Sequence, residues 1–310
     1  MSLHVVAGAG STGSRTALLL AESGERVRLV SRRGLGPAHP LIELAAGDAS
    51  DAERLTELAT GASALINTAW PAYNRWPTDF PPIAAALLSA AERTGATLVS
   101  LSNIYGYGRA DGPLTEDLPM APISVKGAVR AQIWLDALAA HAAGRARVAE
   151  VRAADFLGGD AGSLFNLLVT TPVLAGEPAA YPGDLDAPHS WSFVDDVART
   201  LVTVARDDRA PGHAWHVPST TVSVRELTAR LAARAGAPEP RLTSMSLGDI
   251  AWAGAQDPIV AELIEMSYTM THPELLDSTR TERTFGLSPT PLEDVLADTV
   301  TGNLAGAARA

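Results

Sequence analysis

The hexapeptide GAGSTG is the feature that most restricts how this chain can fold. It places Gly8, Gly10 and Gly13 in the spacing G-x-G-x-x-G, between the apolar run HVVA and the amphipathic stretch SRTALLLAESG. A strand that enters a helix through such a turn is the setting in which this motif binds the pyrophosphate of a dinucleotide. The first glycine permits a tight turn, the second lets the backbone approach the pyrophosphate, and the third lets the helix pack against the strand.

The first turn of the expected helix completes this site. The backbone N–H groups at a helix start have no partner inside the helix, and they carry a positive partial charge. We therefore predict cofactor contacts from Gly8, Gly10, Ser11, Thr12 and Gly13. The alternative is a glycine-rich turn between a strand and a helix that binds nothing.

The chain beyond this loop has the pattern of an α/β protein. Apolar β-type runs alternate with stretches of helical periodicity, which predicts βαβ units and a doubly wound parallel sheet, a Rossmann fold, with helices on both faces. The expected strands cover residues 4–10, 26–31, 42–48, 64–69, 97–102 and 147–158, and the expected helices cover 14–24, 51–61, 81–95 and 125–144.

After about residue 155 the pattern becomes irregular, which predicts a smaller C-terminal lobe. Loops rich in Pro and Gly at 172–190 precede helical stretches at 223–236 and 247–270. We predict a dinucleotide-binding domain at 1–155, to which a segment of about 190–220 returns, and a substrate-binding lobe at 156–310.

Composition excludes several classes of function. The formal net charge of −11 leaves no basic surplus for nucleic acid or an anionic membrane. The chain has no cysteine, its seven histidines lack metal-ligand spacing, and no Gly-x-Ser-x-Gly elbow of a serine hydrolase is present. No signal-like start or long uncharged apolar run appears, so we expect a cytoplasmic protein whose partner is a small-molecule substrate.

The end of the second expected strand indicates which dinucleotide binds. NAD sites place an acidic residue there, whereas this chain has Ser31, Arg32 and Arg33. Two guanidinium groups suit a ribose 2′-phosphate, so NADP(H) is preferred over NAD(H). In the alternative interpretation, both arginines are ordinary surface charges.

Further motifs resemble those of one superfamily, the extended short-chain dehydrogenases/reductases of the NAD-dependent epimerase/dehydratase type. They include GAGSTG, GDASD, INTAW, SNIYGYG, PLTEDLPMAP, VRAADFLG and HSWSFVDDVART, and the resemblance covers nearly the whole chain. It implies that Asp48 contacts adenine and that Asn67, Thr68 and Ala69 run beside the cofactor. It also implies a homodimer formed by helices near 81–95 and 125–143.

The chain departs from this family at the catalytic residues. The family uses Ser/Thr with a Tyr-x-x-x-Lys pair, and no such pair exists here. An ungapped count places Lys126 at the tyrosine, Arg130 at the lysine and Asn103 at the Ser/Thr. A gapped alignment instead places Lys126, the only lysine in the chain, at the family lysine and Pro122 at the tyrosine.

The ungapped alignment suggests an acid–base role for Lys126. Arg130, one helical turn away, and burial would both favour loss of its proton near neutral pH. Lys126 would then donate to a substrate oxygen, Arg130 would hold the cofactor ribose, and Asn103 would orient the substrate. The alternatives are that Lys126 only binds ribose or phosphate, or that it is an incidental surface lysine.

Aromatic residues and one histidine complete the candidates. Tyr105 and Tyr107 follow the fifth expected strand, where either could supply a catalytic phenol or simply pack. Trp70 and Tyr73 could form an aromatic wall over the substrate, and His189 could contact it.

The sequence thus favours an NADP(H)-dependent oxidoreductase acting on a carbonyl or secondary alcohol of a natural-product intermediate or a sugar nucleotide. The alternatives are a non-redox isomerase or lyase, and a non-catalytic NADP(H)-binding regulator.

Overall fold

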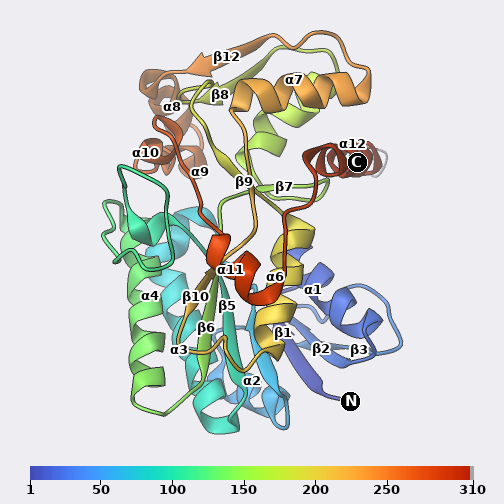
Figure 1. Ribbon diagram of the computed structural model, residues 1–310, viewed down its shortest axis with the longest axis vertical. Helices are drawn as coiled ribbons and strands as arrows, with labels where there is room; N and C mark the ends of the chain where they lie inside the picture. The colour runs from blue at the N-terminus through green and yellow to red at the C-terminus, as the bar shows by residue number, and fades with distance from the viewer. Residues whose placement is uncertain (308–310) are drawn as a thin grey trace.

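The computed structural model describes residues 1–307 and is built around a seven-stranded parallel sheet (Figure 1). The strand order is β10-β6-β5-β4-β1-β2-β3. The order reverses beside β1, so the sheet is doubly wound, and the predicted α/β Rossmann fold is confirmed. The strands are β1 (Leu3–Ala7), β2 (Arg26–Ser31), β3 (Ile42–Ala46), β4 (Ala64–Asn67), β5 (Thr97–Asn103), β6 (Val148–Ala153) and β10 (Ala214–His216).

Helices cover both faces of this sheet because successive strand residues point to opposite sides. On β1, Val6 packs in the core beneath helices α1 and α6, whereas Val5 packs in the core beneath α2, α3 and α4. Figure 1 shows α1 and α6 on one side of the sheet and α3 and α4 on the other. These helices are α1 (Ser11–Glu22), α2 (Ala52–Ala59), α3 (Trp76–Thr94), α4 (Val125–Ala142) and α6 (Val194–Arg206).

A smaller lobe lies beyond the carboxyl ends of the strands, at the top of Figure 1. It contains a three-stranded sheet in the order β11-β9-β7 and a two-stranded sheet of β12 and β8. A separate apolar core joins them to the lobe helices. The strands are β7 (Asp155–Leu157), β8 (Ala179–Pro182), β9 (Ser190–Phe193), β11 (Thr220–Thr221) and β12 (Leu242–Met245), and the helices are α5 (Thr171–Leu174), α7 (Val224–Ala235), α8 (Leu247–Gly254), α9 (Pro258–Ala261), α10 (Ser267–Met270) and α12 (Leu292–Ala307). Helix α11 (Thr279–Phe285) instead packs beside β10 of the large sheet.

Several elements differ from their expected bounds. Helix α3 begins at Trp76 rather than at residue 81, because the buried side chains of Trp76 and Phe80 anchor an additional turn. The strand expected at 147–158 divides into β6 and β7, which belong to different sheets. The helical stretch expected at 247–270 divides into α8, α9 and α10. None of the helices between residues 1 and 307 is long and apolar enough to span a membrane.

Candidate functional site

The glycine loop joins β1 to α1 through backbone contacts that leave no room for side chains at two of its glycines. Gly8 has φ +109°, and a Cβ there would lie 2.7 Å from the backbone nitrogen of Ala69. A Cβ at Gly13 would lie 2.0 Å from the carbonyl oxygen of Gly8 and 2.4 Å from Thr68 Oγ1. Both glycines are therefore required for packing the loop against β4.

Gly10 has different surroundings. A Cβ built on it would meet no atom within 4 Å, and its φ of −72° is accessible to any residue, so neither packing nor backbone geometry requires glycine here. Gly10 is also the N-cap of α1, without a side-chain cap, and the first turn of this helix contains no acidic residue. Its position therefore leaves space beside an uncapped helix start, which fits the anionic pyrophosphate of a dinucleotide.

The segment after β4 supports the loop from beside it. Thr68 Oγ1 donates hydrogen bonds to the carbonyl oxygens of Ala7 and Gly8, at 3.1 and 3.0 Å. The buried Asn67 accepts one from the backbone of Ala69 at 3.0 Å. The structure thus brings these three predicted residues against the glycine loop.

The predicted adenosine side lies at the ends of β2 and β3. Arg32 and Arg33 are exposed, and Ser31 Oγ donates to the carbonyl of Leu35 at 2.9 Å. Asp48 accepts from the backbone and hydroxyl of Ser50, and these hydrogen bonds, with the charge of Arg32 nearby, lower the pKa of Asp48. The two guanidinium groups and this carboxylate therefore occupy one edge of the sheet.

A large cavity of about 710 Å³ opens where β5 and β6 end and the lobe begins. Trp70, Tyr73, Asn103 and Tyr105, all predicted from the sequence, line it. Trp70 follows Ala69, which packs on Gly8, so the cavity begins beside the glycine loop. The lobe contributes most of the remaining lining residues: Asp155, Phe156, Gly159, Asp160, Ala161, Gly162, Ser163, Leu164, Asn166, Leu167, Thr171, Ile259, Leu263 and Asn303.

Within the cavity, Asn103 and the two tyrosines lie close together. Asn103 Oδ1 accepts from the backbone of Tyr105 at 3.2 Å, and the hydroxyls of Tyr73 and Tyr105 are 3.5 Å apart. Burial raises the pKa of Tyr73 and of Tyr105 above the ordinary range. Both phenols therefore keep their protons at neutral pH and can donate a hydrogen bond to a ligand.

Lys126 is fully buried at the start of α4 and does not line the large cavity. Its ammonium group donates to Glu265 at 2.7 Å, contacts Glu262 as well, and lies 4.5 Å from the centre of the Tyr73 ring. The interpretation as an incidental surface lysine is wrong. Two carboxylates, which the sequence did not indicate, therefore face this ammonium group.

Arg130 is also buried, one turn further along α4. It donates to the carbonyl of Leu101 at 2.7 Å and to Ser102 Oγ at 3.2 Å, and its guanidinium group lies against the rings of Trp70 and Phe80. Burial lowers the pKa of Arg130 to about 10. In this arrangement its donors bind the end of β5 rather than the cavity.

Tyr107 is separate from the other candidates. Its hydroxyl is 2.6 Å from His216 Nε2 and accepts from Arg152 at 2.5 Å, while Arg152 also pairs with the buried Glu150. Tyr107 does not line the large cavity, and burial raises its pKa to about 12. The structure thus places this phenol in a buried packing network.

His189 lies behind the cavity wall and not on it. Its Nε2 is 3.1 Å from Asp155, which does line the cavity, and 3.6 Å from Glu274. Burial acts to lower the pKa of His189, but the two carboxylates outweigh it and raise this pKa. For the carboxyl group of Glu274, burial has the opposite effect and raises the pKa to about 8. Within residues 1–307, no group of three or more acidic, His or Cys side chains is placed to hold a metal ion.

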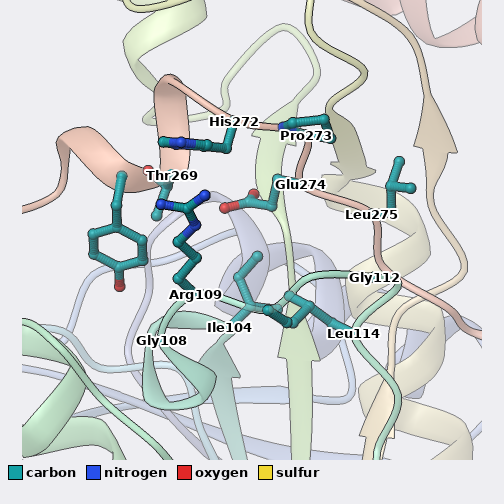
Figure 2. A pocket seen from close by; sticks show the side chains of 12 residues that line it. Ile104, Gly108, Arg109, Gly112, Leu114, Thr269, His272, Pro273, Glu274 and Leu275 are labelled. Carbon is teal, nitrogen blue, oxygen red and sulfur yellow. The ribbon is translucent and has the colours of Figure 1, made fainter.

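Glu274 also lines a second cavity, of about 30 Å³, on the other side of this cluster. Figure 2 shows its carboxylate and the guanidinium group of Arg109 directed toward each other beneath His272. Glu274 therefore connects the buried histidine with a small pocket near the exposed Arg109.

Sequence reasoning missed the carboxylates that surround these sites. Asp155 lies in the segment VRAADFLG without a role assigned to it, Glu274 lies in no motif, and Glu262 and Glu265 share only a spacing that fits one helical face. That spacing could have indicated a paired carboxylate site. Its partner could not be found, because Lys126 is 136 residues away from Glu262.

The fold of this chain is shared by solved structures that include the following three, all determined with NAD bound. The dTDP-glucose 4,6-dehydratase DesIV from Streptomyces venezuelae, solved with NAD, is 24% identical with a TM-score of 0.80, covering 100% of this chain and 98% of that one. MoeE5, solved with UDP-glucuronic acid and NAD, is 24% identical with a TM-score of 0.77, covering 99% and 100%. UDP-glucuronic acid 4-epimerase from Bacillus cereus is 16% identical with a TM-score of 0.79, covering 98% and 99%.

No relative was found among curated protein sequences. At these identities the solved structures establish the fold alone. The family itself is shown by a sequence model for the NAD dependent epimerase/dehydratase family, which matches residues 4–217 and so includes the glycine loop, both buried cations of α4 and the strand β10. The resemblance noted in the sequence is thus confirmed, and the chain belongs to the NAD dependent epimerase/dehydratase family.

Proposed function

We propose that this protein is a nicotinamide dinucleotide-dependent oxidoreductase that acts on a carbonyl or secondary alcohol group of a small molecule. The observation that carries the proposal is the junction of two sites: the glycine loop, with open space at Gly10, and the large cavity that begins at Trp70. The dinucleotide would supply or accept a hydride at this junction. Gly10 and the first amides of α1 would hold its pyrophosphate.

NADP(H) is the proposed form of the cofactor. Arg32 and Arg33 are exposed at the end of β2, where NAD sites present a carboxylate. The solved relatives named above were crystallised with NAD, so the preference needs a direct test. Replacing both arginines with Ala is expected to weaken binding of NADPH at least about tenfold, with a smaller effect on NADH. Equal effects in calorimetry would contradict the assignment.

The proton donor of the proposed reaction can be identified by substitution. Lys126→Arg retains the charge that pairs with Glu262 and Glu265 but cannot exchange a proton at neutral pH. Loss of turnover with unchanged NADPH binding would support Lys126, whose pair with the glutamates must then open during the reaction. Full turnover would exclude Lys126 as the proton donor. The Phe variants of Tyr73 and Tyr105, which line the cavity, would then test their hydroxyls for that role.

The turnover test itself uses NADPH with a panel of ketones and aldehydes, following the absorbance of the reduced nicotinamide. Oxidation of NADPH that depends on one of these compounds would support the proposal. Tight NADPH binding without turnover on any of them would favour the alternatives of a non-redox lyase or isomerase and of a cofactor-binding regulator.

We also propose that the protein forms a homodimer through α3 and α4. These helices pack side by side on one face of the sheet, and Leu135 on α4 remains 47% exposed. Ultracentrifugation of the Leu135→Glu variant is expected to give a monomer. An unchanged mass distribution would place any interface elsewhere.

A further inference from the structure

The wall of the large cavity nearest the glycine loop is aromatic. Ring centres of Trp70 and Trp76 are 5.2 Å apart, those of Tyr73 and Trp76 are also 5.2 Å apart, and Tyr105 lies 6.0 Å from Trp76. Phe156 extends this wall, with its ring 6.4 Å from that of Trp70. These rings hold one another in place, so the wall offers a preformed apolar surface to a flat or ring-bearing ligand.

The charges on the cavity lining are all acidic. Asp155 and Asp160 line it, and no lysine, arginine or histidine does so in the part of the chain that the structure describes. Asp155 pairs with His189, so this imidazole adds no surplus positive charge to the lining. Burial raises the pKa of Asp160, and the nearby Asp298 and Asp195 raise it further.

Three backbone amides beside Asp160 are already hydrogen-bonded within the protein. The amide of Gly159 donates to Asp298 at 2.8 Å, and the amides of Ala161 and Ser163 donate to carbonyl oxygens within the same loop. A diphosphate is recognised by cationic side chains or by free amides that point at it. These three amides already donate to protein acceptors, so they are not free to bind a diphosphate.

Four cations outside the cavity lining are committed to other groups. Lys126 pairs with two glutamates, and that cluster carries one more negative than positive charge when all three are ionised. Arg130 is bonded to the end of β5. On the lobe, Arg225 pairs with Asp186 and Arg230 pairs with Glu293 in exposed positions that do not line the cavity.

We propose that the large cavity accepts a phosphate-free, ring-bearing substrate, either uncharged or carrying an amine, and excludes nucleoside diphosphate sugars. The aromatic wall favours the apolar body, and the aromatic faces together with Asp155 and Asp160 favour an ammonium group over an anion. This substrate class rests on the proposed function, because the substrate must also present its carbonyl or alcohol near the glycine loop.

Ligand binding can be measured without turnover, which separates this inference from the proposed function. Quenching of tryptophan fluorescence and calorimetry would be recorded for the protein with and without NADPH, using tetralone, an amine-substituted tetralone and UDP-glucose. We expect both tetralones to bind and UDP-glucose to fail, and we expect the amine to bind more tightly at low salt. UDP-glucose binding as tight as that of tetralone, or absence of binding by both tetralones, would overturn the inference. A failure of NADPH to bind would instead overturn the proposed function.

Substitutions of the cavity carboxylates test how charge selects the ligand. Asp160→Asn removes one cavity carboxylate, and we expect it to reduce the preference for the amine-bearing tetralone by about threefold to tenfold. Asp155→Asn should also reduce the preference for the amine, although this substitution removes the ion-pair partner of His189 as well. Asp111→Asn, on an exposed loop outside the cavity lining, makes the same change in net charge and should leave the preference unchanged. Equal preference in all variants would show that the carboxylates do not select the ligand.

Discussion

The glycine loop is identified by one six-residue motif, whereas the large cavity joins residues from both halves of the chain. Gly8 and Gly13 are fixed by one another and by the segment after β4. In contrast, Tyr73 and Asn103 meet Asp160, Ile259 and other lobe residues across the cavity. The loop can therefore be interpreted from a short motif, while the cavity depends on pairings that only the folded chain reveals.

The sharpest test of this contrast lies inside the loop. Gly13→Ala introduces a Cβ at 2.0 Å from a backbone oxygen, which neither the strand nor the helix can relieve without moving. We expect a loss of more than about 3 kcal/mol in the free energy of unfolding, because overpacking against backbone shifts whole elements. Urea unfolding measures it, and a wild-type midpoint in this variant would show that the loop is not as tightly packed as described.

The next largest effect is expected at Lys126, which belongs to the cavity region. Lys126→Met leaves Glu262 and Glu265 facing each other without their cation, at side-chain exposures of 29% and 24%. We expect a loss of about 2 to 3 kcal/mol, less than for a fully buried pair. Adding Glu262→Gln and Glu265→Gln to the Met variant should restore much of that stability. A triple variant as unstable as Lys126→Met would contradict the role of this pair.

A pH effect is expected from the cluster behind the cavity. Burial holds the pKa of Glu274 at about 8, against a usual value of 4.5. Between these two values the folded protein keeps a proton that the unfolded chain releases, so stability falls as the pH rises through this window. The raised pKa of His189 acts in the same direction.

We expect stability to fall across that window, measured by thermal unfolding in a series of buffers. Glu274→Gln cannot ionise, and it should flatten the dependence. A variant whose stability falls with pH as steeply as the wild type would show that Glu274 is ionised throughout.

The smallest change in stability is expected at Gly10. Gly10→Ala places a methyl group in open space at an extended backbone position, so unfolding should change by less than about 1 kcal/mol. Binding of NADPH should nevertheless weaken at least about tenfold, because the methyl group occupies the side where the pyrophosphate is predicted. Comparison with Gly13→Ala separates the two uses of glycine in one loop, and unchanged NADPH binding would remove Gly10 from the site.

The sequence was sufficient to predict the parts of the molecule whose causes are local. The motif 8–13, the strand pattern and the expected helix starts at 125 and 223 all indicate their structure within a few residues. Trp70 and Tyr73 line the cavity, and they follow a strand at its carboxyl end, where the sequence predicted a substrate site.

The parts that could not be predicted depend on long-range contacts. Nothing near Lys126 indicates that two glutamates of the lobe will cover it, since a charge pair has no periodicity in sequence. Tyr107 stands next to the site in sequence, but its hydroxyl turns to Arg152 and His216. Helix α12 was also not foreseen, because its packing partners in the lobe core lie far back in the chain.

The attachment of Lys126 to the lobe affects how its variants must be interpreted. The segment that carries Glu262 and Glu265 also carries Ile259 and Leu263, which line the cavity. Breaking the ion pairs of Lys126 would therefore let this wall of the large cavity shift. Slower turnover in a Lys126 variant then has two causes to separate, the changed cavity wall and the loss of a proton donor. Only a substitution that keeps a cation paired with Glu262 and Glu265 can distinguish the two causes.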